Sequence, residues 1–284
     1  DPQVRVVEQD IHKIDEAALL ELLEGHTALV FAAGLDDRQT PPRPSYPLFH
    51  AANVEAPARL LRLAKRTSIS RAVILGSYFT YFQRQWPHLK LAERHPYIHS
   101  RVEQQRVAFA TAAPEISLCF LELPYIFGAL PGRAPLWTPL VNYLRSTKTV
   151  FYTKGGSACV SVQAVAQAIA GAVESGQGGS AYPIGEENLT WQELLTRLAK
   201  AEGRDIRVIA LPNALVVPAL WALWLIHRLQ GKESGLDPRY LLDLQSANTF
   251  FDPRPAQQQL NFQGGLLEQA LAETVAACPP KEKK

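Results

Sequence analysis

The chain has 284 residues, of which 47% are hydrophobic and 20% charged, enough to bury a large core in one or two globular domains. Its 29 basic and 27 acidic residues leave a formal net charge of +2, which lacks the broad basic field that nucleic acid requires. The three cysteines lie far apart without a CxxC pair, which argues against a disulfide framework or a metal site and favours a cytoplasmic protein.

The first part of the chain alternates apolar runs of strand length with amphipathic helical stretches, the pattern of βαβ units around a parallel sheet. Asp15 is expected to cap the first helix, and Gly25 to end it. We predict strands at 4–7, 28–33, 72–75 and 118–123, and helices after Asp15, at about 51–65 and around 102–108. The fold class is therefore α/β, with a doubly wound, Rossmann-type parallel sheet.

The rhythm changes beyond Gly128, where three prolines lie close together, and we predict a smaller, interleaved α/β domain there. One more helix follows at 162–173, then a strand at 182–184 and a capping box formed by Thr190 and Glu193. The predicted domains are 1–128 with 160–186, and 129–159 with 187–276; a disordered tail is predicted at 277–284.

The stretch 211–226 is the most apolar part of the chain. It contains Pro212 and Pro218 and is shorter than the ~20 residues that cross a bilayer, so a transmembrane segment is not expected. A buried helix or lid of the second domain is the favoured interpretation. Peripheral contact with lipid stays open, because Arg228 and Lys232 follow directly.

Six short motifs occur in an order and spacing that resemble the extended short-chain dehydrogenases/reductases, the NAD-dependent epimerase/dehydratase family, over nearly the whole chain. They are Asp10-Ile11, Phe31-Ala32-Ala33-Gly34, Asn53, Leu75-Gly76-Ser77, Tyr97-Ile98-His99-Ser100-Arg101 and Pro124-Tyr125-Ile126-Phe127-Gly128. The segment 250–260 also resembles the usual C-terminal segment of that family.

This resemblance implies an NAD- or NADP-dependent enzyme with Ser77, Tyr97 and Arg101 as catalytic residues. The residues that it implies at the cofactor are Asp10, Ile11, Ala32, Ala33, Gly34, Tyr97, Arg101, Pro124, Tyr125 and Ile126. It further implies a small-molecule substrate and a homodimer formed through the helices at 51–65 and 101–112.

The residue types suit hydride transfer at a secondary alcohol, which needs a group that accepts the hydroxyl proton. A phenol serves if a nearby cation stabilises its anion, and positions four apart on a helix share a face, so Arg101 can stand beside Tyr97. Ser77 would bind the same substrate oxygen. The family has lysine where this chain has Arg101, and a guanidinium differs from an ammonium in shape and acidity.

The family's pattern opens with a strand, a Gly-rich turn and a helix that holds the pyrophosphate, and no such GxxGxxG motif is present. The resemblance thus implies two further βα units ahead of the first strand and a sheet that is incomplete at the N-terminus. The choice between NAD and NADP cannot be read without them. Glu122 and Tyr125 stand where sugar-nucleotide epimerases tend to have Arg and Asn, which favours a small or apolar carbonyl compound.

Two hypotheses follow. The first is an NAD(P)-dependent oxidoreductase or epimerase that acts on a small or apolar carbonyl or alcohol compound, or on a sugar derivative. The second is a non-catalytic NAD(P)-binding regulatory or protein-interaction module with the same fold, which Arg101 favours.

Overall fold

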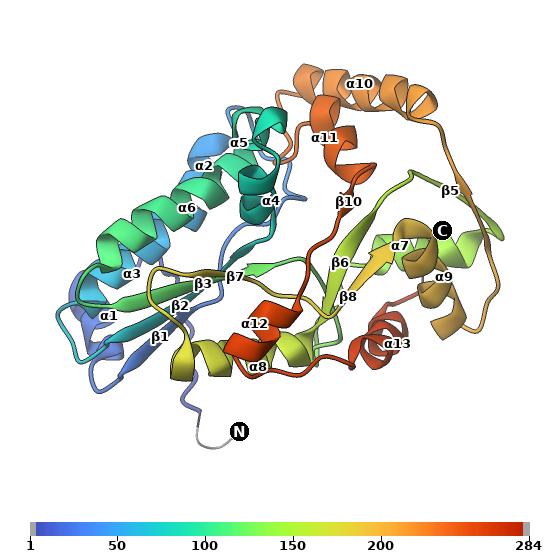
Figure 1. Cartoon of the computed structure of the whole chain (residues 1–284). Coiled ribbons are helices and arrows are strands. Elements are labelled where there is room, and N and C mark those ends of the chain that lie inside the picture. The colour runs from blue at the N-terminus through green and yellow to red at the C-terminus, as the bar shows by residue number, and fades with distance from the viewer. Residues whose placement is uncertain (1–3, 281–284) are drawn as a thin grey trace.

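The computed structural model describes residues 4–280. Its first sheet has four parallel strands in the order β1-β2-β3-β7 (Figure 1). These are β1 (Ala28–Phe31), β2 (Arg71–Ser77), β3 (Ser117–Leu123) and β7 (Ala181–Pro183). The sheet and its flanking helices confirm the predicted parallel α/β fold.

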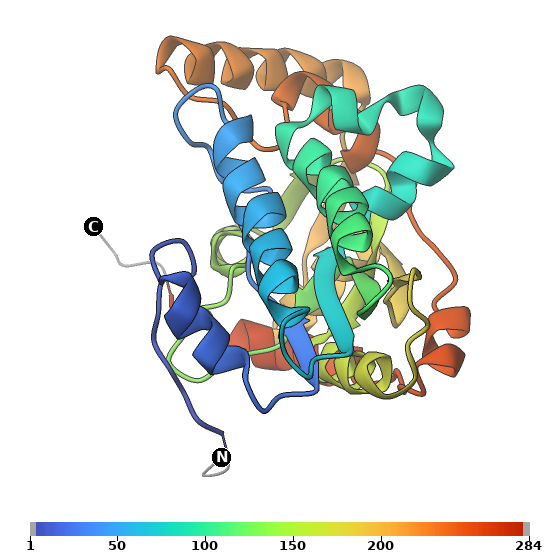
Figure 2. The ribbon, with the colours of Figure 1, turned by 90° about the vertical axis from the view of Figure 1, so that its left-hand side faces the viewer.

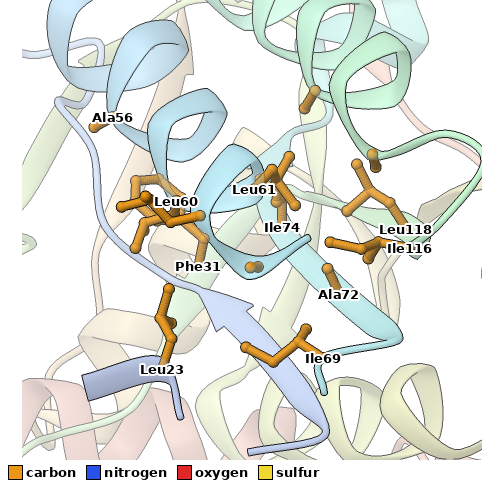
Figure 3. Packing of buried hydrophobic residues seen from close by; sticks show 14 of the residues in the cluster. Leu23, Phe31, Ala56, Leu60, Leu61, Ile69, Ala72, Ile74, Ile116 and Leu118 are labelled. Carbon is orange, nitrogen blue, oxygen red and sulfur yellow. The ribbon is translucent and has the colours of Figure 1, made fainter. Parts of the chain in front are cut away.

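Alternate side chains of the central strands reach the two faces of this sheet. Ala72 and Ile74 of β2 pack with helices on one face, whereas Val73 packs on the other. The first face carries α1 (Glu16–Leu23), α3 (Ala56–Ala64) and α6 (Pro96–Ala112), and the second carries α8 (Val162–Ser175) and α12 (Arg254–Gln259). Figure 3 shows Leu60 and Leu61 of α3 against Ile74 and Phe31, the packing that closes the first face.

Most of the predicted elements in this part are confirmed. The Asp15 carboxylate accepts a hydrogen bond of 2.8 Å from the amide of Ala18 and so caps α1. The helix predicted at 51–65 begins earlier, because α2 (Tyr46–His50), a π-helical turn η1 (Ala51–Glu55) and α3 follow one another without a break. Figure 2 shows these three as one rod beside α6.

The strand predicted at 4–7 is wrong. These residues form no strand, and Val4 and Val6 are 62% and 80% exposed. An apolar run becomes a strand only when another strand supplies its hydrogen-bond partners, and within residues 4–280 none lies beside this run.

The second half contributes two smaller sheets. In one, β6 (Gly156–Ser161) pairs with β4 (Tyr125–Phe127), β10 (Asn248–Thr249) and β8 (Glu187–Thr190), and in the other β5 (Thr149–Tyr152) pairs with β9 (Arg207–Ala210). Their core packs against α7 (Thr138–Ser146), α9 (Trp191–Ala201) and α13 (Leu267–Ala277). The Thr190–Glu193 capping box at the start of α9 is confirmed. The division into two domains stays a prediction, and β4, placed in the first domain, joins the sheet of the second half.

Short helices complete the chain: α4 (Phe79–Gln85), η2 (Pro87–Leu89), α5 (Leu91–Arg94) and α11 (Pro238–Gln245). The apolar stretch forms α10 (Asn213–Leu229), in which no residue is buried, so the predicted buried helix is wrong, and the alternative of a lid stays a prediction. Its main neighbour is α11, at the outer end of the molecule (Figure 1). No helix within residues 4–280 is long and apolar enough to span a membrane.

At the carboxyl end, Ala277 belongs to α13 and Cys278 is buried. Order therefore extends into the range 277–284 that the sequence predicted as a disordered tail. Residues 281–284 of that range lie outside the described residues.

Candidate active site

The carboxyl ends of β1, β2 and β3 lie at one edge of the first sheet. The three strands are parallel, and Ser77 at the end of β2 is in register with Leu123 at the end of β3. The turn 32–34 follows β1 at this edge and is exposed. In doubly wound folds ligands bind outside the carboxyl ends of the strands, so this edge is the candidate site.

The first turns of α6 bring Tyr97 and Arg101 together. The two side chains lie one turn apart on the same face of the helix, and they are only 5% and 8% exposed. Arg101 Nε donates a hydrogen bond of 3.1 Å to Tyr97 Oη, and the guanidinium carbon lies 5.2 Å from the centre of the Tyr97 ring. A cation is thus fixed at the phenol oxygen.

The remaining guanidinium donors of Arg101 hold the surrounding chain. Arg101 Nη1 donates to Gln104 Oε1 at 3.0 Å, and Nη2 donates to the carbonyl oxygen of Leu35 at 3.3 Å. The second bond ties α6 to the turn after β1. All three guanidinium nitrogens therefore have a partner within the protein.

Asn53, in the π-helical turn, holds the same turn after β1 as Arg101 does. Its Oδ1 accepts from the amide of Leu35 at 2.9 Å, and its Nδ2 donates to Ser100 Oγ at 3.0 Å. Gly34 has φ +142°, and a Cβ there would lie 2.6 Å from Asn53 Oδ1 and 3.3 Å from Arg101 Nη2. Only glycine lets the backbone come this close to both side chains.

Ser77 is not hydrogen-bonded to Tyr97. Its Oγ accepts from the amide of Phe79 at 3.3 Å, and the Phe79 ring meets the Tyr97 ring edge-on, with centroids 6.3 Å apart. Phe79 thus connects the predicted catalytic serine and tyrosine, although no direct bond joins them.

The other predicted cofactor residues lie in three places. Ala32, Ala33 and Gly34 form the exposed turn after β1. Asp10 bonds to the amide of His12, and the carbonyl of Ile11 accepts from Arg59, so this pair is tied to α3. Pro124 follows β3, while Tyr125 and Ile126 belong to β4.

Glu122 belongs to a buried network of polar side chains. Its carboxylate is fully buried and accepts from both Nη atoms of Arg84 at 2.7 Å, from Gln105 Nε2 at 2.8 Å and from Thr80 Oγ1. These bonds hold α4 and α6 to β3. A carboxylate occupied in this way carries no information about the substrate, so only Tyr125 remains of the sequence argument for a carbonyl compound.

Two residues at this edge escaped the sequence analysis. Burial raises the pKa of the Asp37 carboxyl, an effect that Arg38 and Arg101 oppose. Burial likewise raises the pKa of Tyr78, whose hydroxyl is hydrogen-bonded to Ser157 Oγ at 3.0 Å. The sequence pointed to them in part, because Asp37 follows closely on the motif at 31–34 and Tyr78 follows directly on the motif at 75–77.

A connector, residues 231–237, runs from α10 to α11 across the start of α6. The carbonyl of Gly235 accepts from the amide of Tyr97 at 3.0 Å, and the amide of Asp237 donates to His95 Nδ1 at 2.9 Å. A Cβ on Gly235 would lie 2.8 Å from Phe49 Cζ and 3.2 Å from Tyr97 Cβ. The connector therefore packs directly on the candidate catalytic tyrosine.

A surface depression lined by residues 129–134, Pro279 and residues of α13 contains no predicted site residue, and the same holds for one lined by Thr190 and residues of α9. Among residues 4–280, no three His, Cys, Asp or Glu side chains gather closely enough to hold a metal ion.

No model of a known protein family matches the sequence, and a search of curated proteins found no match. Several solved structures are similar in fold. The crystal structure of gox2253 has a TM-score of 0.74 and 17% identity, with 95% of this chain and 82% of that chain covered.

Two other similar structures hold a nicotinamide cofactor. MoeE5 in complex with UDP-glucuronic acid and NAD has a TM-score of 0.63 and 19% identity, with 95% of this chain and 84% of that chain covered. RMD from Pseudomonas aeruginosa, complexed with NADPH, has a TM-score of 0.66 and 13% identity, with 96% and 89% covered. The chain has the Rossmann-type α/β fold of these structures.

Proposed function

We propose that this chain is an NAD(P)-dependent oxidoreductase or epimerase of the extended short-chain dehydrogenase/reductase type, which transfers hydride with Tyr97 as its acid-base residue. The observation that carries the proposal is the 3.1 Å hydrogen bond from Arg101 Nε to Tyr97 Oη at the carboxyl edge of a parallel sheet. NAD and NADPH in the similar structures support the same reading.

In this proposal Tyr97 exchanges a proton with the substrate oxygen. Arg101 lies in hydrogen-bond contact with the phenol oxygen, where its positive charge would stabilise the negative charge that develops as the proton is transferred. Ser77 would donate its hydroxyl to the substrate oxygen, at which negative charge develops. Asn53 positions both the turn 32–34 and α6.

The residues at the sheet edge fit the nicotinamide and ribose half of the cofactor. Ala32 and Ala33 are exposed, and Gly34 allows the chain to lie against Arg101. We assign the cofactor to these residues together with Asp10, Ile11, Tyr97, Arg101, Pro124, Tyr125 and Ile126. A bound nicotinamide gives or takes the hydride.

The substrate is proposed to be a small or apolar carbonyl or alcohol compound, or a sugar derivative. Aromatic rings gather beside β4, where the Tyr125 ring lies 5.1 Å from Trp137, 5.7 Å from Trp191 and 6.2 Å from Tyr78. Tyr78 and Trp191 are buried, so the half-buried rings of Tyr125 and Trp137 are the ones that could present an apolar surface to such a substrate. UDP-glucuronic acid bound to MoeE5 supports the sugar derivative.

Cofactor binding and turnover, measured separately, test the proposal. Calorimetry with NADH and NADPH should detect binding, and a panel of carbonyl and sugar compounds should yield turnover. Tyr97→Phe should lower turnover by ~100- to 1000-fold or more at nearly unchanged cofactor affinity, and Ser77→Ala should act in the same sense but more mildly. Tyr143→Phe, on the exposed side of α7, is the matched control.

A non-catalytic NAD(P)-binding module is the second candidate. One observation favours it: Arg101 is engaged by Gln104 and Leu35 as well as by Tyr97, as a purely structural brace would be. Cofactor binding without turnover of any compound in the panel would support this alternative, whereas turnover that Tyr97→Phe leaves intact would rule out Tyr97 as the acid-base residue. Absence of cofactor binding would remove both candidates.

We also propose a homodimer that pairs the helices at 51–65 and 101–112, since symmetric dimers are the commonest assembly. One chain has a mass of 31.4 kDa, and light scattering at micromolar concentration should give twice that mass. A clean monomer would contradict this arrangement.

A further inference from the structure

Helix α10 presents apolar side chains to solvent along its whole length. None of its 17 residues is buried. Figures 1 and 2 show it lying along the outer end of the molecule, with α11 beneath it. Its exposed large apolar residues are Leu215, Val217, Trp221, Leu223, Leu225, Ile226 and Leu229. So many large apolar side chains on one exposed helix mark a contact surface.

Only one narrow line of α10 faces the protein. Val216, Leu220, Trp224 and His227 are half-buried, and they recur at the spacing of one helix face. Arg239 of α11 lies over the Trp224 ring, at 4.6 Å from its centre. A partner that covered the other exposed residues would have to surround the helix on three sides, which a fluid lipid layer does more readily than a rigid protein groove.

The charged side chains within the segment 211–232 are of one sign. The segment 211–232 contains no Asp or Glu, whereas Arg228 and Lys232 are exposed at its carboxyl end. In a contact between the α10 helices of two copies, these cations would meet no acidic partner, because the same segment of the second copy contains none. An anionic headgroup layer instead attracts them, and Trp221 and Trp224 are of the type enriched at membrane interfaces.

The length of α10 excludes a span and suits a position in the plane of the interface. Seventeen residues extend ~25 Å along the helix axis, less than the hydrocarbon core of a bilayer. We propose that α10 docks flat onto an anionic lipid bilayer, with its apolar side chains in the boundary between headgroups and acyl chains and with Arg228 and Lys232 at the headgroups. This inference does not depend on the proposed function.

Sedimentation of the full chain with vesicles tests the proposal. The protein should bind vesicles of phosphatidylcholine that contain phosphatidylglycerol, and bind vesicles of phosphatidylcholine alone more weakly. Leu215→Asp/Leu229→Asp should lower the partition coefficient about tenfold or more. The matched control is Leu130→Asp/Leu136→Asp, because Leu136 and Leu215 are exposed to 65% and 66%. This control should bind like the wild type.

The charge component has its own variant. Arg228→Glu/Lys232→Glu should weaken binding to the anionic vesicles and leave the weak binding to neutral vesicles unchanged, and high salt should reproduce the loss. Circular dichroism verifies that each variant is folded.

Three results would overturn the proposal. The first is a wild type that sediments with neither vesicle. The second is equal loss of binding in the α10 variant and its control. The third is light scattering in which Leu215→Asp/Leu229→Asp converts a dimer into a monomer without any change in vesicle binding, which would assign this face to a second copy of the chain.

Discussion

Helices α6 and α10 are both 17 residues long, and they differ in what they bury. α6 buries the polar side chains of Ser100, Arg101 and Gln104, whereas α10 buries none of its residues, although most of them are apolar. Neighbours, not composition, decide burial: α6 packs against the sheet and against α2, η1, α3, α4 and α5, whereas the main neighbour of α10 is α11. Buried polar groups and exposed apolar ones are the informative departures, and here they mark two different surfaces.

Truncation of one side chain in each helix gives the largest expected contrast. Ile98 of α6 is fully buried, so Ile98→Ala should lower the free energy of unfolding by about 2–5 kcal/mol. Leu223 of α10 is 39% exposed, and Leu223→Ala should change the free energy of unfolding by about 0.5 kcal/mol or less. Urea unfolding measures both. An equal loss of unfolding free energy in the two variants would show that Leu223 is buried against a partner in solution.

Substitution of Arg101 tests whether the buried polar groups of α6 serve chemistry or packing. Arg101→Ala should lower turnover by ~100- to 1000-fold and weaken cofactor binding, because the lost charge serves the phenolate and the ribose together. Arg101→Lys should preserve or raise activity, since an ammonium supplies the same charge in the form that the family uses. Should lysine leave the protein inactive yet equally stable, the requirement would be for the forked geometry of arginine.

The pH dependence of stability probes the start of α6. Burial lowers the pKa of His95 to about 4 from the ordinary 6.5, and its Nδ1 accepts the Asp237 amide, which requires that nitrogen to be unprotonated. The unfolded chain then binds the proton first as pH falls, so stability is lost from about pH 6.5 down to pH 4, by about 3 kcal/mol in all. Urea midpoints across this range measure the loss.

His95→Asn provides the matched comparison for that measurement. The amide oxygen of asparagine still accepts a hydrogen bond but does not titrate, so the variant should have a flatter profile than the wild type. His88→Asn alters an exposed histidine of η2 and should leave the profile unchanged. The same slope in all three proteins would assign the acid sensitivity to other groups.

The first sheet was predictable because its signals are local. Each strand is a short apolar run, and the run 118–123 is continuous because β3 is covered on both faces. The pair Tyr97 and Arg101 was predictable for the same reason, since a spacing of four on a helix fixes their proximity. The strand predicted at 4–7 failed because a strand also needs a partner.

The second half was less predictable because its contacts join distant parts of the chain. β6 pairs with β10, about 90 residues further on, and His95 bonds to Asp237 across 142 positions. No window of the sequence records such contacts. The burial of Glu122 was hidden likewise, because its partners Arg84 and Gln105 come from two different helices.

The hydrogen bonds of the connector, residues 231–237, define one local unfolding step that hydrogen exchange can detect. The amides of Tyr97, Gly235 and Asp237 donate to Gly235, Gln39 and His95, so separation of the connector from α6 and from the 39–41 segment breaks all three bonds together. Amides that are released by one local unfolding step exchange their hydrogens with solvent at one shared free energy. Tyr97, although helical, therefore belongs to the exchange unit of the connector and not to that of the later turns of α6.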